Sequence, residues 1–432
     1  MKVAIYTLGC KVNQYETQAL ERGLLDRGHQ LTAFESPADV YIINTCTVTA
    51  VSDKKSRNTI RRARKRNPHA VVAVCGCYAQ TDPQAVEALG VDVVAGTGDR
   101  MAFLDLLEQA AARKDSQIVR VDDALRRRVF EVLPAGGLEG RTRALLKVED
   151  GCVNFCSYCI IPYARGPIRS LPLEQAVLQS QALAAQGYRE IVLTGIEISS
   201  WGADLRNGSG LIELVEAVCG AVPGLRVRLG SLEPRTITED FCRRAAALSN
   251  LCPHFHLSLQ SGCDATLRRM NRKYDTARYL QSVELLRTYF SAPAITTDLI
   301  VGFPQETEQE FSATLAFLTR CAFSSMHIFP YSQRTGTPAA GMTGQIPKEE
   351  KERRAHRAAE VAHQLEQDYL HQLVGQTLPV LFEEEKDGLW QGHAPNYVAV
   401  QVRGQNLHNQ LHPVLITGVA GSALLGALVE PA

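Results

Sequence analysis

The 432-residue sequence contains no apolar run of the roughly 18–20 residues that a membrane-spanning helix requires. Its N-terminus, MKVAIYTLG, has a single lysine before a short apolar stretch, which predicts a buried strand rather than a secretory signal. Net charge is also absent, because 46 Lys and Arg balance 46 Asp and Glu, and this balance excludes a uniformly basic coat for nucleic acid. We therefore expect a cytoplasmic protein that makes no contact with a membrane.

Cysteine, by contrast, is abundant. Twelve cysteines occur in a chain that shows no export signal, and disulfides are rare in reducing compartments. The cysteines therefore indicate thiol or metal chemistry rather than a disulfide scaffold. The remaining composition, 45% hydrophobic and 21% charged, is that of an ordinary globular chain. Its length corresponds to about two to four domains of roughly 100–200 residues.

The first part of the chain, residues 1–115, alternates short apolar runs with longer amphipathic ones, which predicts an open parallel sheet flanked by helices. The predicted strands are 2–8, 40–44, 70–75 and 91–95, and the predicted helices are 14–27, 52–67 and 99–112. Residues 116–140 contain an arginine-rich piece and a glycine pair, and are predicted to connect this domain to the next.

Residues 141–370 continue the alternation with a regular spacing. Strands are predicted at 144–148, 190–194, 226–230, 254–258, 295–301 and 326–329, separated by helices such as 173–186 and 306–321. Six strand–helix units indicate a partial α/β barrel rather than a complete eightfold one. Residues 371–432 change to short strands with Gly, Asn and Asp turns, which predicts a small β-barrel. The predicted fold class is therefore α/β, followed by an all-β domain.

Cys152, Cys156 and Cys159, here called the barrel triad, form a C-x3-C-x2-C motif just after the first predicted barrel strand. Three thiolates at this spacing can wrap one face of an iron–sulfur cube, each binding one iron, so that the fourth iron keeps an open position for a small molecule. A structural zinc site would need four ligands, and no fourth Cys or His lies nearby in the sequence. Zinc and inert buried thiols are the alternatives.

Cys10, Cys46 and Cys77, here called the sheet triad, are far apart in sequence, but each follows a predicted strand of the first domain. The C-terminal ends of parallel strands form one crevice, so these thiols are predicted to hold a second metal group. Free cysteine is also a common core residue, and Cys75 competes with Cys77 for the third position. We favour Cys77 because it is nearer the strand end. The cysteines expected in the core are Cys75, Cys219, Cys242, Cys252, Cys263 and Cys321.

Polar motifs follow the later barrel strands. Gly195 lies in TGIEISS after the second strand, Glu233 in GSLEP after the third, and Gln260 in SLQSGC after the fourth. Barrel enzymes gather their sites at these strand ends, so the three residues are predicted to contact a cofactor or a substrate. Gly195 also has a structural interpretation as a turn residue, and Glu233 has one as a helix-start carboxylate.

The motifs LGCKVNQYE, NTCTVT, GCYAQ and IPYARG, followed by QSGCDATLRRMNR, TDLIVGFPQETEQEF and YSQRTGTPA, resemble those of radical S-adenosylmethionine methylthiotransferases over essentially the entire chain. The resemblance implies that the barrel triad holds a [4Fe–4S] cluster whose open iron binds S-adenosylmethionine, with Gly195, Glu233 and Gln260 beside it. It also implies that the sheet triad holds an auxiliary [4Fe–4S] cluster carrying the sulfur, and that the last domain is a TRAM-like barrel.

Within this family, GCKVNQYE is similar to the enzymes that modify N6-threonylcarbamoyladenosine beside the tRNA anticodon, and Lys11 and Val12 carry this assignment. The implied reaction replaces the adenine C2–H with C2–SCH3, and its implied partners are tRNA, a reducing electron donor such as a flavodoxin, and a sulfur donor. Methylthiolation of isopentenyladenosine (whose branch has GCQMN) or of a ribosomal protein residue (GCPKN) is the alternative. Glu197 departs from the family, which has His, or Gln–Asn in sister branches, at this point.

RNA contact is predicted on the helix at residues 52–67. Arg57, Arg61 and Lys65 are spaced i, i+4, i+8, and Arg62 with Arg66 lies beside them. Such a ridge suits phosphate contacts, although a solvated helix face is the structural alternative.

The terminal domain is acidic. From residue 379 onward, two basic residues, Lys386 and Arg403, face five acidic ones: Glu383, Glu384, Glu385, Asp387 and Glu430. This composition favours either a neutral RNA-binding face with stacking side chains or contact with a basic ribosomal protein. The candidates for the neutral face are Trp390, His393, Asn396, Tyr397 and Asn409. A zinc-containing RNA-binding protein is the alternative from a different functional class.

Overall fold

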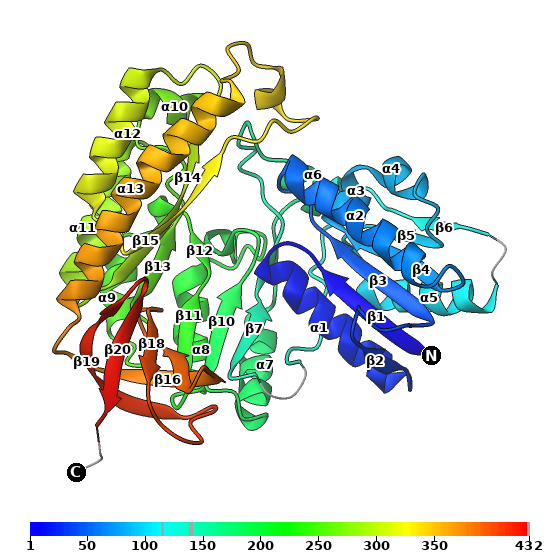
Figure 1. Ribbon diagram of the computed structural model, residues 1–432, viewed down its shortest axis with the longest axis horizontal. Coiled ribbons are helices and arrows are strands. Elements are labelled where there is room, and N and C mark those ends of the chain that lie inside the picture. Colours follow the sequence, from blue (N-terminus) through cyan, green and yellow to red (C-terminus); the bar gives the residue numbers. More distant parts are fainter. Residues whose placement is uncertain (114–115, 138–140, 430–432) are drawn as a thin grey trace.

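The computed structural model describes residues 1–113, 116–137 and 141–429. An N-terminal sheet domain lies beside a barrel domain, and a small C-terminal β-barrel packs against one end of the barrel domain (Figure 1). This arrangement confirms the predicted α/β fold class with an all-β domain after it. Among the described helices, none combines the length and the apolar character needed to cross a membrane.

Six parallel strands form the N-terminal sheet, in the order β2-β1-β3-β4-β5-β6. The strands are β1 (Lys2–Thr7), β2 (Gln30–Thr32), β3 (Val40–Thr45), β4 (Val71–Gly76), β5 (Val93–Ala95) and β6 (Ile118–Arg120). The helices are α1 (Lys11–Asp26), α2 (Ala50–Arg66), α3 (Cys77–Thr81), α4 (Pro83–Glu87) and α5 (Arg100–Ala112). Every residue of β3 and β4 is buried, because helices cover both faces of a parallel sheet.

The sheet has two strands that the sequence did not reveal. β2 and β6 have three residues each, too few to show a hydrophobic period. β6 pairs with β5 and lies inside residues 116–140, where a connection was expected. The end of that segment, residues 138–140, lies outside the described residues.

All six predicted barrel strands are present. They are β7 (Arg143–Lys147), β10 (Glu190–Thr194), β11 (Arg226–Leu229), β13 (His254–Leu257), β14 (Ala294–Val301) and β15 (Ser325–Pro330). β7, β10 and β11 pair in parallel. After Gly230, the chain continues as β12 (Ser231–Leu232), which pairs with β13, and β14 and β15 follow. The strands therefore form the predicted six-unit open barrel.

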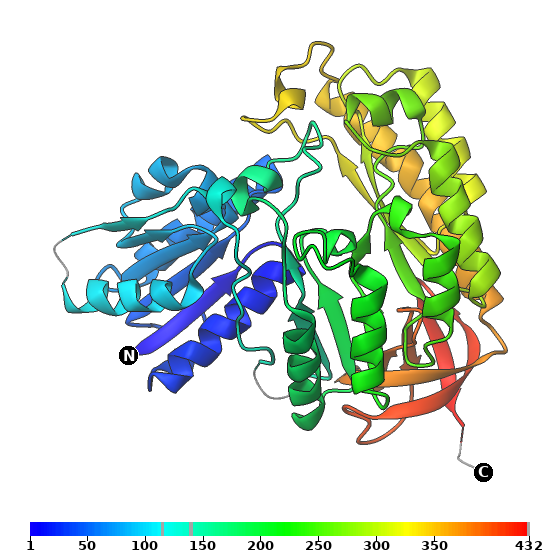
Figure 2. The same ribbon diagram turned by 180° about the vertical axis from the view of Figure 1, so that it is seen from behind.

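Helices cover the outer side of these strands (Figure 2). The long ones are α7 (Leu173–Ala185), α8 (Leu211–Ala221), α9 (Glu239–Ala246), α11 (Thr276–Tyr289), α12 (Glu308–Cys321) and α13 (Lys348–Gln372), and a short one is α10 (Asp264–Arg269). The short helix α6 (Ile161–Arg165) contacts α3 of the N-terminal domain instead. A small antiparallel pair, β8 (Glu149–Asp150) and β9 (Arg169–Ser170), lies beyond β7. Four short 3-10 turns, η1 (Ala124–Arg126), η2 (Ile198–Ser200), η3 (Pro234–Thr236) and η4 (Pro338–Gly341), complete the domain and its connection.

The C-terminal domain is a closed five-stranded barrel in the order β16-β17-β18-β20-β19. Its strands are β16 (Thr377–Lys386), β17 (Leu389–His393), β18 (Ala399–Val402), β19 (Leu411–Ala420) and β20 (Ala423–Leu428). It packs against the N-terminal ends of the barrel strands, where Arg143 pairs with Glu383 at 2.8 Å. Arg228 donates from Nη1 to the carbonyl of Pro395 at 2.7 Å.

A buried group of charged residues, here called the Glu16 cluster, joins the N-terminal domain to the barrel domain. Its members are Glu16, Arg100, Lys147, Asp150, Arg165 and Arg169. Glu16 on α1 pairs with Arg100 at 2.7 Å, with Lys147 at 2.9 Å, and with Arg165. Burial raises the pKa of Glu16, but the surrounding cations outweigh it and hold the pKa well below the usual range. The carboxylate is therefore charged and fully paired.

Replacing Glu16 with Gln should lower the free energy of unfolding of the metal-free protein by about 3–5 kcal/mol, because a buried cation is left without its carboxylate. Urea denaturation followed by circular dichroism measures the change. The matched control is Glu352→Gln, which removes an exposed partner of Lys348 at 3.4 Å and should cost less than about 1 kcal/mol. Equal losses for the two variants would show that the Glu16 cluster does not hold the domains together.

Candidate functional site

The sheet triad gathers at the C-terminal ends of three adjacent strands. Thr45 pairs with Gly76 in the register of β3 and β4, so the following residues, Cys46 and Cys77, lie next to each other. Gly9, before Cys10, has a φ of +103°, and a Cβ there would lie 2.9 Å from the Cβ and the Sγ of Cys46. Only glycine allows the Cys10 loop this close approach. The structure therefore brings the three predicted cysteines to one crevice.

Cys75 is the alternative to Cys77 as the third ligand of the sheet triad. It is fully buried in the hydrophobic layer formed by Ile42 and Ala73 of the sheet and by side chains of α1 and α5, and burial raises the pKa of its thiol to about 12. Among the other cysteines expected in the core, Cys263 is only partly buried, because it precedes the first residue of α10. The remaining four are buried, as predicted: Cys219, Cys242, Cys252 and Cys321.

The barrel triad lies in the loop between β8 and α6, beyond the C-terminal end of β7. Burial raises the pKa of Cys152 and of Cys159 to about 12, and it raises the pKa of Cys77 to about 11. These thiols are therefore protonated near neutral pH in the metal-free protein. Binding of a metal group to them requires thiolates and releases protons.

Each triad has a thiol that accepts a hydrogen bond from an arginine. The buried Arg165 lies with its Nε 3.4 Å from Cys77 Sγ, and the partly buried Arg272 lies with its Nη1 3.2 Å from Cys156 Sγ. A guanidinium in this position compensates the negative charge of a thiolate ligand. The sequence alone predicts no role for either arginine, although Arg165 belongs to the IPYARG motif and Arg272 to the QSGCDATLRRMNR motif, on which the family resemblance partly rests.

Each triad offers three thiols, which is the donor set that a [4Fe–4S] cluster with one open iron needs. Within the described ranges, no three His, Cys, Asp or Glu side chains are grouped so that they could hold one metal ion. The assignment of the two triads as cluster ligands stays a prediction.

The three residues predicted at the strand ends have different surroundings. Gly195 follows β10, and a Cβ at this position would lie 2.8 Å from the carboxylate of Glu149. Glu233 precedes η3 and accepts hydrogen bonds from the backbone N of Arg235 at 3.2 Å and from its Nε at 3.0 Å, which is the helix-start role. Gln260 has a φ of +67°, in the left-handed region that non-glycine residues adopt infrequently. Contact with S-adenosylmethionine stays a prediction for all three.

Glu197, where the sequence departs from the family, forms local contacts. Its carboxylate accepts hydrogen bonds from the backbone N of Ser199 at 3.1 Å and from the hydroxyl of Ser200. Burial raises its pKa. Its backbone N donates to the carboxylate of Glu149 at 2.7 Å. Glu197 therefore shapes the loop after β10.

The predicted RNA-binding ridge on α2 is only partly free for RNA. Arg57 donates to the hydroxyl of Tyr78 at 3.1 Å, and the guanidinium groups of Arg62 and Arg66 lie over the Phe34 ring at 5.7 and 5.6 Å. Arg61 and Lys65 are exposed and make no hydrogen bond or ion pair with any described residue. Lys54 and Lys55, earlier on the same helix, are exposed as well.

The neutral face expected on the C-terminal barrel needs two corrections, at Trp390 and at Asn396. Trp390 is buried in the core of this barrel with Val400 and Val402, so its ring is not available for stacking on a base. Asn396 is buried too and donates to the hydroxyl of Tyr369 at 3.1 Å. Tyr397 and His393 are partly exposed and stack on each other at 4.8 Å. Glu430, one of the five acidic residues, lies outside the described residues.

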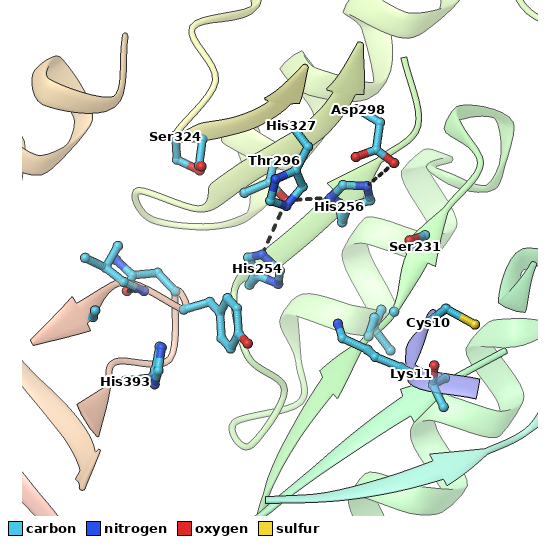
Figure 3. Close-up of a pocket in the computed structure, with 18 of the residues that line it drawn as sticks. Cys10, Lys11, Ser231, His254, His256, Thr296, Asp298, Ser324, His327 and His393 are labelled. Carbon is cyan, nitrogen blue, oxygen red and sulfur yellow. Dashed lines mark hydrogen bonds and ion pairs between the residues drawn. The ribbon is translucent and has the colours of Figure 1, made fainter. Parts of the chain in front are cut away.

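A cavity of about 740 Å³, here called the central cavity, lies between the three domains (Figure 3). Residues 9–12 of the N-terminal domain, including Cys10, line it on one side, and residues from 393 to 399 of the C-terminal barrel line it on another. The barrel strands contribute histidines and hydroxyls, and His256 Nε2 lies 3.3 Å from a carboxylate oxygen of Asp298. The sheet triad therefore borders a polar space large enough for a nucleoside.

Comparisons with known proteins agree with this arrangement. Residues 2–96 match the model of "Uncharacterized protein family UPF0004", and residues 146–318 match that of the radical SAM superfamily. The chain is 41% identical over 410 residues to the threonylcarbamoyladenosine tRNA methylthiotransferase MtaB of Bacillus subtilis, covering 93% of this chain and 90% of that protein. The MtaB of Thermotoga maritima is 36% identical over 431 residues, which cover 99% and 97% of the two chains.

Two further proteins are similar to the chain, one named for a different nucleoside and one with a much lower sequence identity. The tRNA-2-methylthio-N(6)-dimethylallyladenosine synthase of Symbiobacterium thermophilum is 33% identical over 452 residues, covering 99% of this chain and 94% of that protein. The solved structure of the radical S-adenosylmethionine methyltransferase TsrM from Kitasatospora setae covers 90% of this chain and 80% of its own, with a TM-score of 0.55 at 15% identity. This last likeness concerns the fold alone.

Iron analysis distinguishes Cys77 from Cys75. After anaerobic reconstitution, Cys77→Ala should bind about half of the iron and sulfide of the unmodified protein, because one of two four-iron clusters loses a ligand. Cys75→Ala should keep the full iron content, since Cys75 packs in the core. Iron and sulfide assays with visible spectra measure both variants. Full iron in Cys77→Ala together with half in Cys75→Ala would reassign the third ligand.

Proposed function

The chain belongs to the MtaB-type radical S-adenosylmethionine methylthiotransferases, and we propose that it replaces the C2 hydrogen of N6-threonylcarbamoyladenosine beside the tRNA anticodon with a methylthio group. The observation that carries this proposal is the contact of Arg165 with Cys77. Arg165 lies six residues after Cys159 in the sequence, so this contact brings the segment of the barrel triad to the sheet triad. An aromatic C–H has no acidic proton for a general base to remove, so a radical route suits this substitution.

Each triad has a distinct role in this proposal. Cys152, Cys156 and Cys159 would hold the cluster that binds S-adenosylmethionine, and the sheet triad would hold the auxiliary cluster. When bound, the first cluster supplies the electron that cleaves S-adenosylmethionine to a hydrogen-abstracting radical, and the second supplies the sulfur to be transferred. Three thiolates in each set leave one iron open for these ligands.

Side chains at the domain interface fix the position of the sheet triad relative to the segment of the barrel triad. Arg165 donates from one nitrogen to Cys77 and from others to Glu16 and Asn13, so α6 and α1 cannot shift independently. Arg334, after β15, bonds Asp53 and Thr47 next to Cys46 and thereby closes the N-terminal domain onto the barrel.

The partners follow from this chemistry. The substrate is tRNA, and the reaction also needs a reducing electron donor such as a flavodoxin and a donor that restores the sulfur. The proposed location of the reaction is the cytoplasm. A related reaction on dimethylallyladenosine, as named for the Symbiobacterium thermophilum relative, is the second candidate, since that relative aligns over almost the entire chain.

The nucleoside assay tests the proposed function directly. Reconstituted enzyme with a reductant and S-adenosylmethionine should convert N6-threonylcarbamoyladenosine in tRNA to its 2-methylthio derivative, detected by mass spectrometry of digested nucleosides. The Cys152→Ala variant is the control and should give no product, because the barrel triad is then incomplete. A 2-methylthio derivative of isopentenyladenosine alone would replace the proposal with the second candidate.

Salt dependence of tRNA binding tests the exposed part of α2. The double variant Arg61→Gln, Lys65→Gln should weaken binding and reduce the slope of log K against log salt by about 0.7–0.9 for each phosphate that these two side chains neutralise. Filter binding at several salt concentrations measures the slope. The control, Arg243→Gln with Lys348→Gln, removes exposed charges on α9 and α13 and should leave the slope unchanged. Identical slopes for the two double variants would place the RNA elsewhere.

A further inference from the structure

Lys11 occupies a special place in the central cavity. Apart from histidines, it is the one cation among the described residues that line this cavity. Together with Tyr397 it also lines a smaller adjoining cavity of about 350 Å³. Lys11 is the first residue of α1 and directly follows Cys10, so its side chain starts beside the sheet triad and lies within the cavity (Figure 3).

Two carboxylates near Lys11 are already paired with arginines. Glu190 pairs with Arg226 at 2.8 Å and with Arg228 at 2.7 Å, and Glu383 pairs with Arg143 at 2.8 Å. Among the described residues, none forms a hydrogen bond or an ion pair with the amine of Lys11.

The aromatic ring next to Lys11 is held in place by the same cations. The guanidinium groups of Arg143 and Arg228 lie 5.2 and 4.7 Å from the centre of the Tyr397 ring. His254 and His393 flank this ring at 5.1 and 4.8 Å. Tyr397 itself has a φ of +67°, so a strained backbone is maintained where these contacts meet. The ring of Tyr397 is therefore held in one position in the cavities that it lines together with Lys11.

We propose that Lys11 binds the carboxylate of the threonyl group of the substrate nucleoside and thereby selects threonylcarbamoyladenosine over isopentenyladenosine. This inference rests on the proposed function. A carboxylate would give the unpaired amine a partner, and charge-assisted hydrogen bonds are stronger than neutral ones. A dimethylallyl group carries no charge and offers the amine no partner, which discriminates against it.

A synthetic anticodon stem-loop tests the proposal. It is prepared with threonylcarbamoyladenosine, with the methyl ester of the same nucleoside, and with unmodified adenosine. Binding to reconstituted enzyme without a reductant is followed by anaerobic fluorescence anisotropy, so that no turnover occurs. The unmodified enzyme should bind the acid about ten- to a hundredfold more tightly than the ester. Lys11→Met should bind the two equally, and Lys11→Arg should restore a preference for the acid.

The different RNAs distinguish the two anions that Lys11 could bind, the threonyl carboxylate and an RNA phosphate. If Lys11→Met weakens acid, ester and unmodified RNA by the same factor, Lys11 contacts an RNA phosphate and the proposal is overturned. Equal binding of acid and ester by the unmodified enzyme also overturns it, without any variant. Iron content equal to that of the unmodified enzyme shows that Cys10 is undisturbed in each variant.

Formation of the methylthio product tests the proposed function independently of the role of Lys11. If the unmodified enzyme methylthiolates threonylcarbamoyladenosine while Lys11→Met keeps its full preference for the acid, only the role of Lys11 fails. If the unmodified enzyme yields no methylthio product from this nucleoside, the proposed function fails, whatever the binding data show.

Discussion

The carboxylate of Glu16 receives cations from two domains, Arg100 from the sheet domain and Lys147 and Arg165 from the barrel domain. A buried charge is costly unless its partners are in place, so the cluster is satisfied only when the two domains are docked in one relation. Arg165 also reaches Cys77. The docking that neutralises Glu16 therefore also sets the position of one thiol triad relative to the other, and chemistry that needs both triads depends on it.

The sequence predicted those parts of the fold that are governed by burial. Each of the six barrel strands is a short apolar run between helices, and all six occur. β2 and β6 are too short to show a period, and β12 is separated from β11 only by Gly230. The Glu16 cluster could not be predicted, because its members are ordinary polar positions in separate elements and only the docking of two domains brings them together.

The residues of the candidate site also divide into those that strand topology predicts and those whose role depends on a distant partner. The gathering of the sheet triad could be predicted because parallel topology collects strand ends at one edge, and the same argument favours Cys77, just beyond its strand, over Cys75 within it. Binding of a cluster by these cysteines stays a prediction. Side chains whose role depends on a remote partner were less predictable. Arg62 and Arg66 belong to the predicted basic ridge, yet their guanidinium groups lie over Phe34. Trp390 follows a turn, where exposed residues are common, but its side chain packs in the core of the C-terminal barrel.

The acidity of the C-terminal domain illustrates why a domain's net charge is a weak guide to its substrate. Glu383 is paired with Arg143 and lies 2.7 Å from a ring nitrogen of His393, so this carboxylate is used where the domain meets the barrel. The residues that the domain presents to the central cavity carry no formal charge apart from the imidazole of His393: His393, Asn396, Tyr397, Val398, Ala399 and Ser422. Because the N-terminal domain supplies Lys11 to the same space, recognition of the substrate depends on the relative placement of all three domains rather than on the composition of any one.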